Sequence, residues 1–284
     1  MAATTSVELI EPDSSPARRP RWWPEALVIV WLSWVYDWIA NLTPLRPVAP
    51  YDHARSVLHI EQVLHIDPEA AMDHWLAGHH VLALWLGNYY DNAHFVVTLG
   101  MIGWLWWRHP QLYRPLRTNL VLANVIAFVV FWRYPTAPPR LLNPRVYIDV
   151  VAASHAFGSW HSGTLATAAD ELAAMPSLHV AWAAWSALAF WRIFRRQRWA
   201  VLAWLYPLLT SVVVLATGNH FVLDVLAGFA TLAVSTVIAD RWPAWWSMRR
   251  PAWWPARRAS RRGALTCRKL RRTAPRPTTA RPPG

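Results

Sequence analysis

The sequence predicts an all-α fold: a polytopic helical membrane protein, built as a six-transmembrane-helix bundle with extra interfacial helices in the first outer loop. First, residues 25–241 are strongly apolar, whereas both ends of the chain are polar and basic. Second, several apolar runs reach about 17–22 residues, the length that a hydrocarbon core of ~30 Å requires. Third, many of the 22 tryptophans lie near the ends of these runs, as expected of interfacial aromatic belts.

Arginines orient the predicted spans. They cluster before the first span, between the second and third, between the fourth and fifth, and after the sixth. With six spans these four segments fall on one side, and the positive-inside rule makes that side cytoplasmic. We therefore expect a multi-pass protein of the cell membrane with both termini in the cytoplasm. The predicted spans are 25–42, 91–108, 117–133, 177–194, 199–217 and 220–241.

The first outer segment, residues 43–90, contains more than a plain loop. Val57, Ile60 and Leu64 recur at helical spacing, which indicates an interfacial amphipathic helix. A second apolar stretch, 74–90, is interpreted as an interfacial or re-entrant helix. A seventh span is the alternative, and it would break the agreement among the four arginine segments.

The chain is expected to have three parts: a polar cytoplasmic segment 1–22, a membrane-embedded domain 23–242 and a disordered basic tail 243–284 rich in Pro and Arg. The net charge of +12 comes almost entirely from arginine. We interpret the tail as a polybasic segment beside anionic membrane lipids, with no nucleic-acid partner. The single cysteine, Cys267, excludes a disulfide framework and a cysteine metal cluster.

Three short motifs end apolar runs, and the predicted topology places all of them at the outer face. They are residues 133–140 (RYPTAPPR), 175–179 (MPSLH) and 218–224 (GNHFVLD). Together they bring two arginines, two histidines, a serine and an aspartate to one lipid–water boundary. This combination predicts a phosphoryl-transfer site that acts on a phosphate carried by a lipid.

The third motif carries the predicted nucleophile. His220 and Asp224 are four residues apart and share a helical face, with Thr217 or Asn219 available as the helix N-cap. A carboxylate that binds one imidazole nitrogen leaves the other free to attack phosphorus. Gly228 continues this face and would let another helix approach closely. The alternative, for this pair alone, is a buried His–Asp pair that serves packing.

The other two motifs supply an acid and phosphate ligands. Pro176 suits the first turn of a helix, where free N–H groups and the Ser177 hydroxyl form an anion site. His179, about one turn further, is placed to protonate a leaving oxygen. Arg133 and Arg140, held apart by a Pro-rich link, are expected to clamp phosphate oxygens. The alternative for the arginines is snorkelling at the interface.

These motifs resemble those of the phosphatidic acid phosphatase type 2 superfamily over residues 117–241. Three departures are visible: Leu141 replaces a proline, Leu178 replaces a glycine, and Val213-Val214 stand where the family has Ser-Arg. Arg133 also takes the place of the usual lysine. These departures are similar to the inositol phosphorylceramide synthase branch, an inositolphosphotransferase type with bacterial members that transfers phosphoalcohol headgroups between lipids.

The resemblance implies His220 as nucleophile, Asp224 as its orienting partner and His179 as general acid. It also implies phosphate contacts from three further residues, namely Arg133, Arg140 and Ser177. The arginine missing from the third motif would need a replacement, for which we consider Asn219, or Arg145 and His161. We expect no metal and no cofactor, because arginines and helix dipoles carry the charge stabilisation and no His-Glu-x-x-His motif occurs.

The sequence thus predicts an integral membrane phosphatase or phosphotransferase that acts on lipid phosphates through a phosphohistidine at the outer face. A non-catalytic membrane transporter or scaffold is the alternative. A transporter should show two related halves with interrupted helices, which we do not find, and a degenerate family member should lose one of the two histidines. The sequence leaves open which lipid is used, whether water or an alcohol accepts the phosphoryl group, and the oligomeric state.

Overall fold

The structure, a computed structural model, describes part of the chain: residues 22–42, 48–143, 145–153 and 172–248, the last seven of them only as helical backbone. Over these ranges every regular element is a helix, apart from one isolated bridge between Thr136 and Ala173. The all-α prediction is therefore confirmed. The chain divides into a unit Met1–Arg241, which carries the candidate site, and a unit Trp242–Gly284. The predicted division into 1–22, 23–242 and 243–284 stays a prediction.

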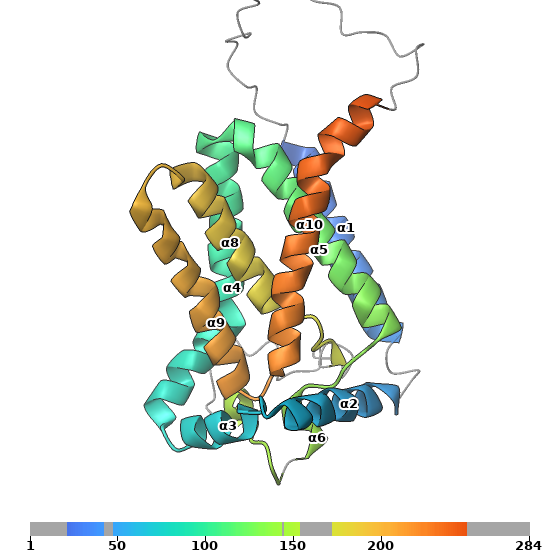
Figure 1. Cartoon of the computed structure of the whole chain (residues 1–284), viewed down its shortest axis with the longest axis vertical. Helices are drawn as coiled ribbons and strands as arrows, with labels where there is room; N and C mark the ends of the chain where they lie inside the picture. Colours follow the sequence, from blue (N-terminus) through green and yellow to red (C-terminus); the bar gives the residue numbers. More distant parts are fainter. Residues whose placement is uncertain (1–21, 43–47, 144, 154–171, 249–284) are drawn as a thin grey trace, which may run out of the picture. The chain divides into compact units, whose positions relative to one another are not determined.

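Long helices of the first unit run alongside one another (Figure 1). Each predicted span coincides with one long helical segment of the described chain. At the centre α8 contacts α4, α5 and α9, and its Trp185 is fully buried. The segments are α1 (Trp22–Leu42), α4 (His80–Arg108), α5 (Pro110–Arg133), α8 (Leu178–Phe194), η3 (Arg198–Trp204) with α9 (Leu205–Ala216), and α10 (Val222–Met248).

The apolar stretch 74–90 is not an element of its own. Its first part belongs to α3 (Glu69–Ala77), which ends at Gly78. Its second part begins α4, so the second predicted span starts at His80 instead of residue 91. At 1.5 Å per residue a helix of 29 residues is roughly 43 Å long. Such a helix can cross the hydrocarbon core and continue beyond it, and residues 74–90 form no separate helix.

Two helices, α2 (Ala49–Leu64) and α3, lie across one end of the long helices (Figure 1). The helix predicted from Val57, Ile60 and Leu64 is thus present, with Val57 buried and the other two exposed. Its place at a membrane interface is a proposal. Two short helices complete this end: α6 (Pro139–Leu142), which contacts α2, and α7 (Val150–Ala153), which contacts α3 and α4.

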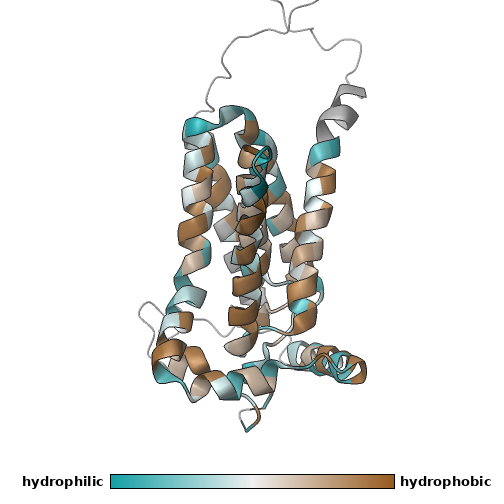
Figure 2. Ribbon diagram, turned by 60° about the vertical axis from the view of Figure 1, so that its left-hand side comes forward, coloured by the Kyte–Doolittle hydropathy of each residue, from teal (hydrophilic) through white to brown (hydrophobic). Residues whose placement is uncertain are grey.

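Length and composition make three helices suited to cross a membrane: Pro110–Arg133, Arg198–Ala216 and Val222–Arg241. Apolar residues cover much of the surface of the long helices, and polar residues gather toward their ends (Figure 2). These features are those of a membrane protein. The count of six spans and their orientation are taken up as proposals below.

Gly228 fulfils the packing role expected of it. A Cβ atom at this position would lie 2.6 Å from the carbonyl oxygen of Ser177 and 3.3 Å from the Cβ of Val180. Glycine therefore lets α10 pack directly against the start of α8. At that start, Ser177 is the N-cap, and its hydroxyl accepts from the Val180 N–H at 3.5 Å.

Candidate active site

Main-chain hydrogen bonds hold the three motifs together at the end of the bundle where α2 and α3 lie. The Ser177 N–H donates to the Asp224 carbonyl, and the Arg140 N–H donates to the Gly218 carbonyl, each at 3.0 Å. Gly218 has a φ of 65°, in the region that favours glycine. The structure thus brings together three segments that are far apart in the sequence.

His220 lies between α9 and α10 and precedes the first residue of α10. Its Nδ1 lies 2.9 Å from the carbonyl oxygen of Ala174, and because a carbonyl can only accept, Nδ1 carries the proton. In the neutral ring Nε2 then holds the lone pair. His220 is 4% exposed and lines a cavity, so this nitrogen is shielded from bulk water.

Asp224 differs from its predicted role in one respect. Its Oδ2 lies 3.5 Å from His220 Nδ1, whereas it accepts from the Phe221 N–H at 2.9 Å. The Ala174 carbonyl therefore fixes the His220 tautomer, and Asp224 is a fully buried neighbour that also caps α10. The i, i+4 contact predicted from the sequence is present, but as a close approach.

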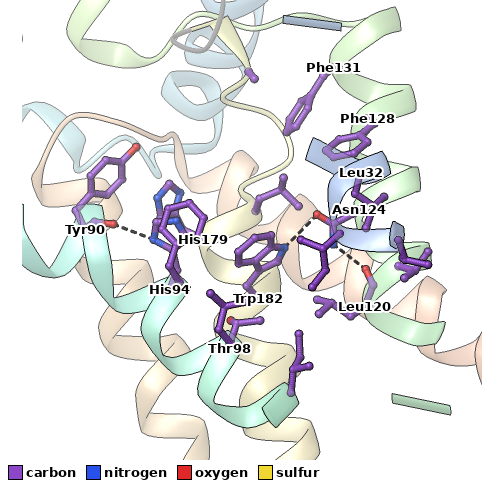
Figure 3. A pocket seen from close by; sticks show the side chains of 18 of the residues that line it. Leu32, Tyr90, His94, Thr98, Leu120, Asn124, Phe128, Phe131, His179 and Trp182 are labelled. Atoms are coloured by element: carbon purple, nitrogen blue, oxygen red, sulfur yellow. Dashed lines mark hydrogen bonds between the residues drawn. The ribbon is translucent and has the colours of Figure 1, made fainter. Parts of the chain in front are cut away.

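His179 projects from the first turn of α8 toward His220. The two ring centroids are 5.7 Å apart, with the planes at 64°. Two rings from α4 enclose His179: Tyr90 stacks on it at 4.3 Å, and His94 meets it edge-on at 4.2 Å (Figure 3). His94 Nδ1–H donates to the Tyr90 carbonyl at 3.0 Å, which fixes the orientation of the His94 ring.

Arg140 is the cation of this site, and it is 9% exposed. Its Nε donates to Asn219 Oδ1 at 2.9 Å, and its Nη1 lies 3.8 Å from Asp149 Oδ2. The Asn219 amide in turn donates to the backbone and side-chain oxygens of Thr217. Arg140 and Asn219 are therefore held in place next to His220, as phosphate ligands need to be.

Two other predicted phosphate ligands do not reach the cavity. Arg133 is exposed at the end of α5, and Ser177 is fully buried as the N-cap of α8. Neither residue lines the cavity that His179 and His220 share. Arg145 is exposed as well, and His161 lies outside the described residues.

The cavity has a volume of about 450 Å³, with polar side chains at both ends. Arg140, Asn219, His179 and His220 line one end, and the wall beyond them is mostly apolar. At the far end Arg117 pairs with Glu25 of α1, at 3.2 Å. Apolar residues of the wall include Leu32, Ile102, Val121 and Phe128.

The cavity also opens through the side of the bundle. Ile29 of α1 and both Phe95 and Leu99 of α4 line the cavity, and yet each is about half exposed on the outer surface. In a membrane these exposed side chains face hydrocarbon. A lipid could therefore reach the polar end from within the bilayer, with its chain along the apolar wall.

Tyr90 and His94 were missed by the sequence analysis. Both face His179, and the signal that could have identified them is their i, i+4 spacing on one helix. The sequence analysis placed Tyr90 in the segment 74–90 and His94 in the span 91–108, so the spacing of the two residues on one helix did not emerge. Trp182 and Asn124 also went unnoticed; the indole N–H of Trp182 donates to Asn124 Oδ1 at 3.3 Å and joins α8 to α5 (Figure 3).

Among the side chains that the structure describes, no group of three or more His, Cys, Asp or Glu residues could hold a metal ion. The expectation of no metal and no cofactor stays a prediction. In a comparison with protein families, a model described as the PAP2 superfamily matches residues 55–238. No curated protein matches the chain, and no solved structure does.

Proposed function

Because the chain belongs to the PAP2 superfamily, whose members are phosphatases and phosphotransferases, we propose that it acts on a membrane lipid phosphate through a phosphohistidine intermediate. One observation carries this proposal. The rings of His179 and His220 lie 5.7 Å apart at one end of a cavity that also presents Arg140 and Asn219. A nucleophile, an acid and an anion ligand thus face the same space.

In the first step, His220 Nε2 attacks phosphorus and the N–P bond forms as the bond to the leaving oxygen breaks. Protonated His179 gives its proton to that oxygen. In the second step, water or an alcohol gives its proton to His179 and attacks phosphorus, and the N–P bond breaks. Both histidines then return to their starting states, and no external proton is consumed.

Arg140 carries the positive charge that this transfer requires. Its guanidinium is held by Asn219 through Nε and lines the cavity, where its N–H groups would bind phosphate oxygens. The Asn219 side chain accepts a hydrogen bond from Arg140 and itself lines the cavity. These two residues are the proposed phosphate ligands, because Arg133 and Ser177 do not line the cavity.

The apolar wall and the side opening support a lipid as the substrate. A soluble phosphate ester would gain nothing from a long apolar cavity, whereas a lipid chain buries apolar surface there. The likeness of the motifs to the inositolphosphotransferase branch extends the proposal to headgroup transfer, with an alcohol as acceptor. We place the site at the extracytoplasmic face, opposite the arginine-rich turns.

The test is turnover by protein purified in detergent with a panel of lipid phosphates, with and without inositol or glycerol. Free phosphate and new lipid products are measured together. We expect one of the two products from the wild type and none from His220→Ala or His179→Ala. His59→Ala, an exposed histidine of α2, serves as the matched control and should retain the wild-type rate.

Free phosphate would identify a phosphatase, and a new headgroup lipid with little free phosphate would identify a transferase. If no substrate of the panel reacts, or if the two histidine variants match the wild type, the proposed function is wrong.

A further inference from the structure

Carboxyl groups bind the first N–H groups of α10, the helix that follows His220. Such groups have no partner within a helix, so other acceptors must be supplied. The predicted caps do not supply them, because Thr217 and Asn219 make hydrogen bonds elsewhere. The pairs are Phe221 N–H with Asp224 Oδ2 at 2.9 Å, Val222 N–H with Glu69 Oε1 at 2.9 Å, and Leu223 N–H with Glu61 Oε1 at 2.6 Å.

The two glutamates come from the helices that lie across the end of the bundle (Figure 1). Glu61 lies in the last turn of α2, and Glu69 is the first residue of α3. Both side chains are fully buried. Glutamate is rarely buried in this way, because removing a charge from water is costly. Two buried glutamates at the start of one helix therefore indicate that their hydrogen bonds to its N–H groups matter to the fold.

The two carboxyl groups also act on each other, and one proton held between them accounts for their burial. Treated as acceptors only, their Oε2 atoms find no donor among the described groups. A hydrogen bond between one neutral and one ionised carboxyl satisfies both and avoids the repulsion of two charges. Burial raises the pKa of Glu61 to about 9 and raises the pKa of Glu69 as well, so the pair keeps a proton at neutral pH.

We propose that Glu61 and Glu69 are positioning residues for His220, because they fix the first turn of α10 from outside the bundle. The inference rests on the proposed function, since it explains how the proposed nucleophile is held in position. His220 is joined directly to this turn, and its ring is otherwise held by Ala174. A displaced first turn would move His220 Nε2 relative to the substrate phosphorus and to His179.

The test compares two substitutions at Glu61. Glu61→Leu nearly keeps the volume but removes the acceptor for Leu223 N–H. Glu61→Gln keeps the acceptor and offers Glu69 an N–H in place of the shared proton. We expect Leu to lower kcat on a lipid phosphate by on the order of tenfold to a hundredfold, with a smaller change in KM, and Gln to restore most of that loss. A folded Leu variant with wild-type kcat, or a Gln variant as slow as Leu, would overturn the proposal.

If the Leu variant does not fold, Glu61→Asp replaces it, because the carboxyl is kept but shortened by one methylene. We expect a lower kcat for Asp than for Gln, and the reverse order would overturn the proposal. Hydrogen exchange at the Val222 and Leu223 amides gives a measure that needs no turnover. Exchange should be faster in Leu or Asp than in Gln and wild type, and equal exchange would also overturn it. A wild type that converts no lipid phosphate contradicts the proposed function instead.

Discussion

At the scale of single residues, the two histidines are held in different ways. His220 is fixed by a hydrogen bond to a main-chain carbonyl, which defines its tautomer. His179 is held between the rings of Tyr90 and His94 and approaches His220 edge-on. The proposed mechanism asks His179 to give a proton and later to take one.

We predict that His94→Ala lowers kcat by about threefold to tenfold, because an aromatic contact of this kind contributes about 0.5–1.5 kcal/mol. His94→Phe keeps a ring against His179 and should recover most of the rate. Turnover of the lipid phosphate identified above is the measurement, with His59→Ala as the control for loss of a histidine. A Phe variant as slow as Ala would show that the imidazole itself is needed.

The residues that the sequence could identify are those that lie in short motifs. His179, His220, Arg140 and Asn219 all reach the cavity wall, as predicted from three stretches of sequence. Arg133 does not, because a place in a motif does not determine which way a side chain points. Tertiary packing alone brings Glu61 and Glu69 to the start of α10, and no local pattern reveals this.

At the scale of elements, the predicted spans agree with the long helices, and their ends differ for physical reasons. Hydropathy does not reveal that α4 begins at His80. The break at Gly78-His79 separates two helices, α3 and α4, whereas the sequence suggested a single interfacial element over 74–90. α10 begins at Val222, two residues later than expected, and the carboxyl groups of Glu69 and Glu61 bind its first two N–H groups.

We predict that Gly228→Ala destabilises the protein by about 1–3 kcal/mol, because the added Cβ meets the Ser177 carbonyl at 2.6 Å. The strain lies at the start of α8, so turnover should fall as well. Gly100→Ala is the matched control, since nothing lies within 4 Å of its added Cβ. That change should be neutral or stabilising by up to about 1 kcal/mol. Thermal unfolding in detergent measures both, and equal effects would contradict the close approach of α10 to α8.

The contact of α2 and α3 with α10 also predicts how stability depends on pH. The pKa of Glu61 is raised in the folded protein, so the protonated side chain adds to the free energy of unfolding. This contribution is complete below the pKa that Glu61 has in the unfolded chain and is lost as pH rises toward about 9. Glu61→Gln cannot ionise, so its melting temperature should rise relative to the wild type between about pH 5 and about pH 8.5. Among the neighbouring charged groups, Asp224 raises the pKa of Glu61 and Asp67 raises that of Glu69, and the two glutamates raise the pKa of Tyr147.

The control for this pH series is Asp52→Asn. Asp52 lies on the same helix, but it is exposed and paired only with Arg55, so its difference from the wild type should hardly depend on pH. A constant difference between Glu61→Gln and the wild type across the series would show that Glu61 does not hold a proton in the folded state.

At the scale of the whole molecule, the site itself explains why only some helices have a plain membrane signal. Length and composition identify α5, η3–α9 and α10. α4 carries polar side chains, among them His94 of the site and the buried Asp91, and α8 has only 17 residues. For the topology of these helices we therefore use the arginine pattern.

That pattern gives the last prediction, which concerns orientation. Cys267 is the only cysteine of the chain, so Cys267→Ser provides a background for single labels. Gln62→Cys tests the exposed surface of α2, at the end that carries the site, and Gln197→Cys tests the exposed turn between α8 and η3. On intact cells a membrane-impermeant maleimide should label position 62 and leave position 197 unlabelled.

After permeabilisation both positions should react equally, which shows that neither thiol is shielded by the protein itself. Turnover by each variant confirms that the fold is intact. The reverse pattern would place the site in the cytoplasm and would contradict the positive-inside argument, since the arginine-rich turns would then lie outside. Labelling of both positions on intact cells would mean an even number of crossings between residues 62 and 197 instead of the three that α4, α5 and α8 provide. Labelling at these two positions therefore tests the topology alone. The assignment of His179 and His220 to the site does not depend on which side of the membrane the site faces.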